Sequence, residues 1–133
     1  MPNHLDRLTL QAMQPSWRRL WRVGFAALLA FVSYKAFSTS SGSTSIEHMD
    51  KVLHVLAFAC LAGVACWSWS PSRQANWRIA LGLTAYGVFI ELVQSQLPWR
   101  EASVADVIAD AAGIALGLAL AHRGRAKWAR PDI

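Results

Sequence analysis

Residues 86 to 113 read YGVFIELVQSQLPWREASVADVIADAAG, and the apolar parts of this stretch carry Glu91, Asp106 and Asp110. Pro98 divides the stretch, because a proline cannot continue a helix through its own position without breaking or kinking it. A charged acid at the centre of a membrane helix costs about 2.5 to 3.5 kcal/mol. We therefore expect two helices joined at Pro98, with the acids facing other helices and not lipid.

The composition of the whole chain is that of a membrane protein. Of its 133 residues, 54% are hydrophobic and only 16% are charged, whereas soluble domains carry charge on about a quarter of their positions. Four segments approach the roughly 20 residues that an α-helix needs to cross a membrane; they are residues 20–37, 51–69, 77–97 and 103–122.

These segments predict an all-α membrane protein with four transmembrane helices in a compact antiparallel bundle. The bundle, residues 20–122, follows an N-terminal arm, residues 1–19, and precedes a basic tail, residues 123–133. We expect no separate soluble catalytic domain.

The distribution of charge predicts the orientation in the membrane. The net charge of +5 would suggest nucleic acid as a partner of a soluble protein, but ten of the thirteen Lys and Arg residues fall on one side of the predicted bundle. Basic residues gather on the cytoplasmic side of membrane proteins, and Trp residues gather at the interfaces. We therefore expect both termini in the cytoplasm, an acidic half that faces outward, and no nucleic-acid partner.

One face of the fourth segment has polar residues at its outer end and small residues further in. Its members are Ser103, Asp106, Asp110, Gly113 and Gly117, at intervals of 3, 4, 3 and 4 residues. Such intervals place all five on one side of a helix. Because a Gly-x-x-x-Gly pair lets two helices approach until their backbones touch, we expect this face to pack against a helix of the bundle or against a second copy of the chain.

The second and third segments carry matching polar faces. Gly87, Glu91 and Gln94 share one face of the third segment, and His54 follows Asp50 by one helical turn in the second. Together with the loop, the three faces provide the candidate ligand-binding residues Asp50, Lys51, His54, Glu91, Gln94, Arg100, Ser103, Asp106 and Asp110.

Local structure offers a second explanation for some of these residues. Ser103 and Asp106 have the spacing of a capping box, in which two side chains bind free amides at a helix start, and Asp50 can cap the second helix in a similar way. Capping and ligand binding therefore both remain open for these three residues. Glu91 lies about 9 Å inside a helix that ends at Leu97, and Asp110 about 10 Å beyond Ser103, at 1.5 Å per residue. For these two acids the structural alternative is a buried ion pair or a protonated acid.

The order of the motifs resembles the VanZ-like family of small bacterial membrane proteins. The motifs are D-K-x-x-H at 50–54, E-x-x-Q at 91–94, P-x-R-x-x-S-x-x-D at 98–106 and D-x-x-G-x-x-x-G at 110–117. Asp110 stands where the family usually has Asn. The resemblance implies a multi-pass protein of the bacterial cytoplasmic membrane, in a family named for a member linked to glycopeptide resistance. Fold-level analogy alone assigns neither resistance nor an activity to this chain.

The candidate residues favour a cell-envelope protein that binds an amphiphile of the outer leaflet. The ligand would be a lipid-linked precursor, a phospholipid head group or a lipoglycopeptide, with Lys51 and Arg100 contacting a phosphate or carboxylate. Membrane lipids or such a precursor are the expected partners, together with a homo-oligomer through Gly113 and Gly117.

Two other functions use the same residues. One is an intramembrane enzyme that acts on a lipid head group or phosphate ester, because a histidine beside carboxylates permits general acid and base chemistry; its candidate catalytic residues are His54, Glu91, Asp106 and Asp110. The other is a proton or ion pathway. Whether the protein is an enzyme is left open. Metal-assisted hydrolysis is a variant of the enzyme, since His54, Glu91, Asp106 and Asp110 offer nitrogen and oxygen ligands. Their spacing matches no known metal-ligand pattern, so the sequence predicts neither a metal nor a cofactor.

Overall fold

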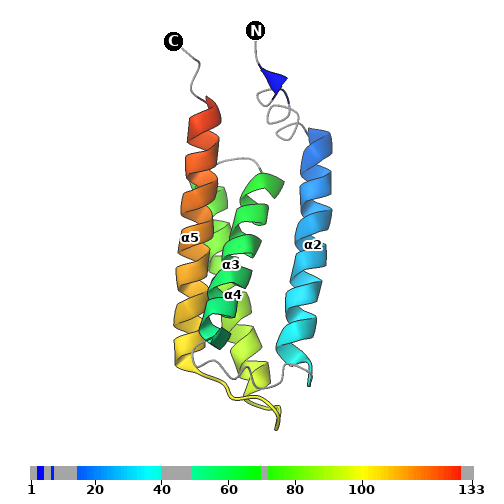
Figure 1. Ribbon diagram of the computed structural model, residues 1–133, viewed down its shortest axis with the longest axis vertical. Helices are drawn as coiled ribbons and strands as arrows, with labels where there is room; N and C mark the ends of the chain where they lie inside the picture. The colour runs from blue at the N-terminus through cyan, green and yellow to red at the C-terminus, as the bar shows by residue number, and fades with distance from the viewer. Residues whose placement is uncertain (1–2, 5–6, 8–14, 40–48, 70–71, 130–133) are drawn as a thin grey trace.

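The computed structural model describes residues 3–4, 7, 15–39, 49–69 and 72–129. Its four long helices are α2 (Pro15–Phe37), α3 (Met49–Ser68), α4 (Arg73–Gln94) and α5 (Val104–Ala129). Consecutive helices run in opposite directions, so that α2 begins and α5 ends at the same end of the bundle (Figure 1). The prediction of an all-α chain with four helices is confirmed, and no strand occurs within the described ranges. Most of the predicted arm, residues 1–19, and residues 130–133 of the predicted tail lie outside those ranges.

Three helices, and not the predicted four, are long and apolar enough to cross a membrane. They are α2, α3 and α5, over Ser16–Phe37, Met49–Ser68 and Val104–Lys127. Helix α4 has sufficient length, with 22 residues, but polar side chains lower its apolar character along its whole length; they include Gln74, Asn76, Arg78, Thr84, Glu91 and Gln94. Two of these, Glu91 and Gln94, are buried against the other helices.

The helix ends differ from the predicted ones for local reasons. Helix α4 stops at Gln94 and not at Leu97, because the chain tightens into a turn in which the Leu97 amide donates to the Gln94 carbonyl oxygen, at 3.0 Å. Glu91 therefore lies only about 4.5 Å inside the helix end, at 1.5 Å per residue, and not the predicted 9 Å. Helix α5 continues past His122 to Ala129, so most of the predicted tail is helical.

The most extensive helix contact joins α3 to α5. These two helices are parallel neighbours (Figure 1), and their backbones meet at Gly113 and Gly117. A methyl group added at Gly113 would overlap the carbonyl oxygen of Val55, and one added at Gly117 would overlap that of Ala59. The small-residue face predicted in α5 therefore lies against α3 of the same chain.

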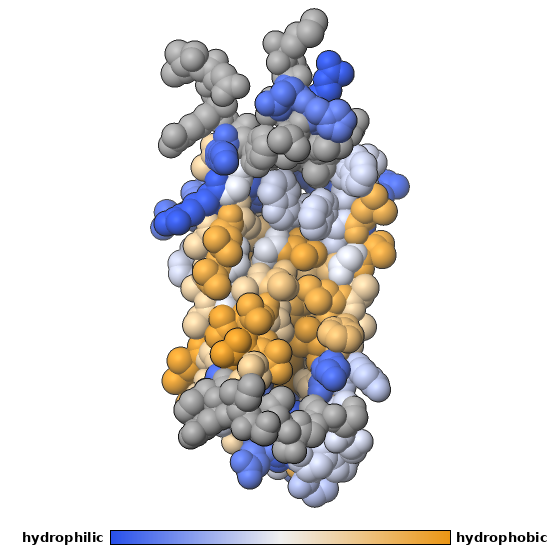
Figure 2. All heavy atoms as spheres, viewed as in Figure 1, coloured by the Kyte–Doolittle hydropathy of each residue, from blue (hydrophilic) through white to orange (hydrophobic). Residues whose placement is uncertain are grey.

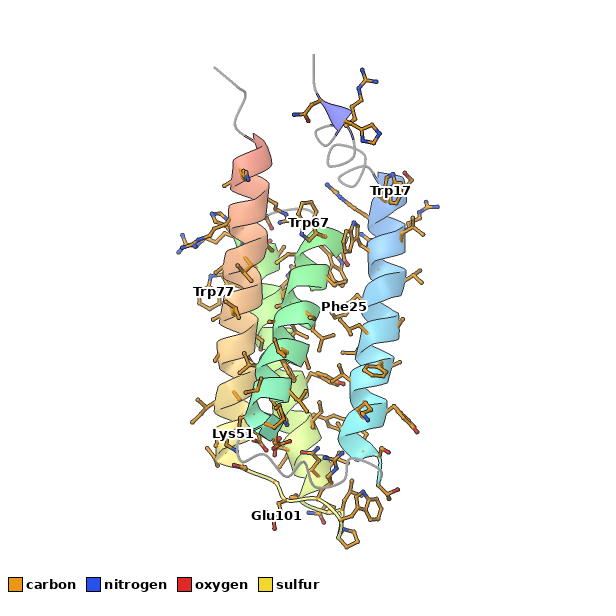
Figure 3. The ribbon with its side chains drawn as sticks, in the orientation of Figure 1. Trp17, Phe25, Lys51, Trp67, Trp77 and Glu101 are labelled. Carbon is orange, nitrogen blue, oxygen red and sulfur yellow. The ribbon has the colours of Figure 1, made fainter. Side chains whose placement is uncertain are left out.

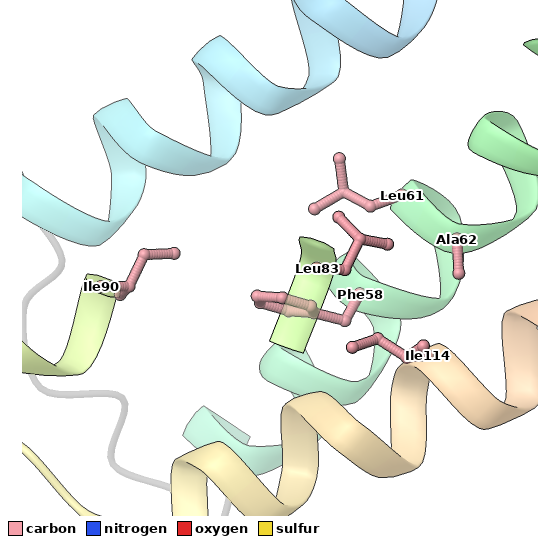
Figure 4. Packing of buried hydrophobic residues seen from close by; sticks show 6 residues of the cluster. All are labelled: Phe58, Leu61, Ala62, Leu83, Ile90 and Ile114. Atoms are coloured by element: carbon pink, nitrogen blue, oxygen red, sulfur yellow. The ribbon is translucent and has the colours of Figure 1, made fainter. Parts of the chain in front are cut away.

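An apolar core fills the middle of the bundle (Figure 4). Its buried members are Phe58, Leu61, Ala62, Leu83, Ile90 and Ile114. Helix α2 packs against this core with partly buried side chains, contacts α3, and touches α4 less. The visible outer surface carries a hydrophobic middle zone between hydrophilic ends (Figure 2), which is the pattern expected of a surface in contact with lipid.

Aromatic and basic side chains meet where α2 begins and α3 ends. The rings of Trp21 and Trp67 stack with centroids 6.0 Å apart, and the Arg125 guanidinium lies 5.4 Å from the Trp67 ring centroid. Trp17 and Trp67 both lie toward this end of the bundle (Figure 3). This arrangement suits a membrane interface, where Trp rings and basic side chains are both enriched.

The Gly117 contact predicts a large difference between two Gly→Ala substitutions. Gly117→Ala should lower the free energy of unfolding by about 1 to 3 kcal/mol, because overpacking forces the two backbones apart. Gly82→Ala is the matched control, because its added methyl group meets no atom within 4 Å and alanine favours the helix by about 1 kcal/mol. The measurement is SDS-induced unfolding in mixed micelles followed by circular dichroism. Equal stability of the two variants would contradict the close α3–α5 contact.

Candidate functional site

The polar faces of α3, α4 and α5 meet near the end of the bundle that holds the loop between α4 and α5. Lys51 and Glu101 mark this end (Figure 3). The side chains buried there have exposed fractions between 1% and 7%; they belong to Glu91, Gln94, Asp106 and Asp110. The three buried acids therefore face other helices and not the surrounding lipid.

Two polar contacts, one helical turn apart, connect α3 to α5. The Lys51 ammonium donates to Asp106 Oδ1 at 3.2 Å, and His54 Nδ1 lies 2.7 Å from Asp110 Oδ1. Asp50 is at the margin, with its side chain 59% exposed and its Oδ1 4.0 Å from His54 Nε2. The Gly113 and Gly117 contacts continue the same line of α5, so close backbone packing and paired side chains share one interface.

Glu91 of α4 binds the first turn of α5. Its Oε2 accepts a hydrogen bond from the Ser103 amide at 3.0 Å, while Ser103 Oγ accepts one from the Ala105 amide at 3.2 Å. In a capping box the acid three residues after Ser103 would bind the Ser103 amide. That acid, Asp106, contacts Lys51 instead, and Glu91 takes its place. Ser103 is thus a capping residue, and Asp106 is not.

Asp110 is enclosed by three helices. On α4, Gly87 leaves room for it, because a Cβ at this position would lie only 2.8 Å from Asp110 Oδ2. Two buried oxygens of the cluster, Asp110 Oδ2 and Glu91 Oε1, have no hydrogen-bond partner among the described residues. The cluster therefore has acceptors in its interior that the described chain does not satisfy.

Gln94 and Arg100 donate hydrogen bonds to the backbone at the end of α2. Gln94 Nε2 donates to the Ala36 carbonyl oxygen at 2.8 Å, and the Arg100 guanidinium donates to the carbonyl oxygens of Lys35 and Ser38, at 2.5 and 3.2 Å. Arg100 forms no ion pair with a described carboxylate, and its Nε is buried without an acceptor. The nine predicted residues therefore fall into two groups. Gln94 and Arg100 bind the end of α2, and the others lie at or beside the cluster of buried carboxylates.

A groove of about 330 Å³ runs between α2, α3 and α4 beside this cluster. Its lining is apolar along most of its length, through Phe31, Val32, Ala36, Leu53, Ala57, Phe58 and Ile90, and polar at one end, through Lys35, Asp50, His54, Gln94 and Arg100. The sequence did not predict the α2 side of this groove. The one feature of the sequence that points to it is Lys35, a charged residue in the last turn of α2.

A second groove, of about 370 Å³, lies between the same three helices toward the opposite end. Its lining includes Trp69, Arg78 and Tyr86 but none of the buried acids. The smaller groove is therefore the one that adjoins the site.

Nitrogen and oxygen atoms of the site are close enough to act as ligands of one ion. In each of two sets, one ligand atom per residue lies within 4.8 Å of the others; the sets are Asp50, His54 and Asp106, and His54, Glu91 and Asp110. His54 belongs to both sets and also lines the groove, so it connects the carboxylate cluster with the space beside it.

Comparison with known proteins agrees with this arrangement of motifs. A model of the VanZ/LLP1 family matches residues 7–125. No curated protein matches the chain, and no solved structure does so. The match spans all four helices up to the last turn of α5, and the chain therefore belongs to the VanZ/LLP1 family.

Proposed function

We propose that this protein binds a membrane amphiphile, with an acyl chain in the groove between α2, α3 and α4 and the head group at the groove's polar end. The observation that carries this proposal is the lining of the groove, which changes from apolar to polar along its length. Its volume of about 330 Å³ falls within the range of about 300 to 1,000 Å³ that is typical of ligand sites. Phe31 and Leu53 on its rim are 59% and 53% exposed, so a lipid chain can enter sideways.

The polar end of the groove suits an anionic or zwitterionic head group that contains a phosphate. Lys35 and Arg100 provide positive charge there. The buried Arg100 Nε lacks an acceptor among the described residues, and an unmade hydrogen bond of a buried charged group is unfavourable. A phosphate oxygen would satisfy it through a charge-assisted hydrogen bond. Lys51, which the sequence suggested for this role, pairs with Asp106 instead.

We place the protein in the bacterial cytoplasmic membrane with the carboxylate cluster toward the outer side. Family membership supports the membrane setting, and the excess of Lys and Arg near the start of α2 and the end of α5 supports a cytoplasmic location for that end. In this arrangement α4 crosses the membrane beside the three apolar helices, which cover its polar residues Glu91 and Gln94. The ligand is then a lipid or lipid-linked precursor of the outer leaflet.

An enzyme that acts on a lipid head group is the second candidate. The observation that favours it is the position of His54, which lines the groove and contacts Asp110 at 2.7 Å. A carboxylate that orients a histidine beside a substrate is a common arrangement for general base chemistry. An ion pathway has less support, because the buried residues described beyond Asp110 include no acid, histidine, lysine or arginine.

Filling the groove should weaken lipid binding. Ala57→Trp places a large side chain in the groove and should weaken binding of a fluorescently labelled phosphatidylglycerol by at least about tenfold, or about 1.4 kcal/mol. Ala85→Trp on the exposed face of α4 is the matched control and should bind as the native chain does. The measurement is fluorescence anisotropy in detergent micelles, with thermal unfolding as a check on folding. Native affinity in Ala57→Trp would refute the groove as the lipid site.

The proposed orientation predicts which exposed positions react from outside the cell. In a chain with both native cysteines, Cys60 and Cys66, replaced by alanine, Glu101→Cys should react with a membrane-impermeant maleimide in intact cells. Arg73→Cys at the opposite end should react only after the membrane is opened. Both positions are exposed in the folded chain. The reverse pattern of labelling would show that the site faces the cytoplasm.

A further inference from the structure

The two unsatisfied oxygens of the carboxylate cluster would be satisfied by a positively charged or hydrogen-donating occupant. Glu91 and Asp110 are each more than nine-tenths buried, with exposed fractions of 7% and 1%. Their oxygens Oε1 and Oδ2 have no partner among the described residues. Burial of carboxylate oxygens without donors is unfavourable, so a donor or cation in this space would stabilise the folded protein.

The atoms around this space have the arrangement of a metal site. One ligand atom each from His54, Glu91 and Asp110 lies within 4.8 Å of the other two. Ligands that are about 2.0 to 2.2 Å from a zinc ion lie about 3 to 4 Å from one another, so a small contraction of the cluster suffices. His54 Nδ1 and Asp110 Oδ1 are 2.7 Å apart, at hydrogen-bond distance, and would separate slightly around an ion. We propose that His54, Glu91 and Asp110 bind a divalent cation of the zinc type.

The balance of charge favours a divalent cation over a protonated His54 alone. Asp106 is compensated by Lys51 at 3.2 Å, while Arg100 donates to backbone carbonyl oxygens. A protonated His54 would compensate one of the two remaining carboxylates and leave the other uncompensated in a poorly solvated site. A divalent cation with a neutral imidazole compensates both, which matters where the dielectric constant is low.

Neighbouring residues support the same set of ligands. Asp50 Oδ1 lies 4.0 Å from His54 Nε2, beyond hydrogen-bond distance, and a small approach would let this carboxylate orient the imidazole, as carboxylates commonly do for metal-binding histidines. Gly87 leaves the space that Asp110 Oδ2 occupies. Nitrogen and carboxylate ligands in this combination suit Zn²⁺ and also Mn²⁺. Three protein ligands leave a position for water or for a phosphate oxygen, as in catalytic zinc sites.

The sequence spacing gave no sign of this site, because its ligands come one each from α3, α4 and α5. Known zinc motifs are recognised by two ligands close together in one segment. Here the three residues are 37 and 19 positions apart, from 54 to 91 and from 91 to 110. Only the packing of the helices brings them together.

Metal binding is tested on the purified full chain, stripped with a chelator and then dialysed against buffered Zn²⁺. We expect about one zinc per chain by mass spectrometry of the metal content. Glu91→Gln and Asp110→Asn should each lower the Zn²⁺ affinity by at least about tenfold, since even indirect partners of a metal contribute about 10- to 100-fold. His122→Gln and Glu101→Gln remove an exposed histidine and an exposed acid and should leave the affinity unchanged.

A spectroscopic measurement keeps the test independent of effects on folding. Co²⁺ in place of Zn²⁺ should give visible absorption bands of a tetrahedral site with nitrogen and oxygen ligands in the native chain, and these bands should be lost in Glu91→Gln that retains native helicity. Zinc content in the native chain no higher than in the Glu91→Gln, Asp110→Asn double variant would overturn the proposal. Equal Zn²⁺ affinity in the native chain and Glu91→Gln would do the same. Lipid binding is measured separately, so either proposal can fail alone.

Discussion

The contact between α3 and α5 determines the arrangement of the rest of the bundle. Gly113 and Gly117 bring the two backbones together, and the same register places His54 against Asp110 and Lys51 against Asp106. The glycines supply close approach and the polar pairs supply specificity, because a shifted register would leave buried charges unpaired. Helix α4 then completes the site, with Gly87 against Asp110 and Glu91 on the first turn of α5.

Helix α2 is held differently, and this difference creates the groove. It packs on α3 but touches α4 less, and the hydrogen bonds of Gln94 and Arg100 hold its end near the carboxylate cluster. The groove lies along this weaker contact and ends at His54. A lipid in the groove and an ion in the cluster would therefore meet at one histidine, so the two proposals concern adjoining parts of one site.

Much of this structure was predictable from residue intervals, and some was not. The intervals of 3 and 4 in α5 identified the face that carries Asp106, Asp110 and both glycines, because helical periodicity depends only on local geometry. They did not show that this face would pack against α3. Helices adjacent in sequence are the usual packing partners, and the neighbour of α5 in sequence is α4. The early end of α4 and the part that Glu91 plays in capping also depend on contacts between segments. The apolar α2 gave no periodic signal for the groove that it forms.

The central claim is that the partly buried His54 and the buried Asp110 form a specific pair that fixes α3 against α5. A double-mutant cycle with His54→Gln and Asp110→Asn tests it, with the free energy of unfolding measured in mixed micelles and in the presence of a chelator. A hydrogen bond to the charged Asp110 carboxylate predicts a coupling energy of about 1.5 to 3 kcal/mol. The exposed His122→Gln combined with Asp110→Asn should show additive effects. Additivity of His54→Gln and Asp110→Asn to within about 0.5 kcal/mol would contradict the claim.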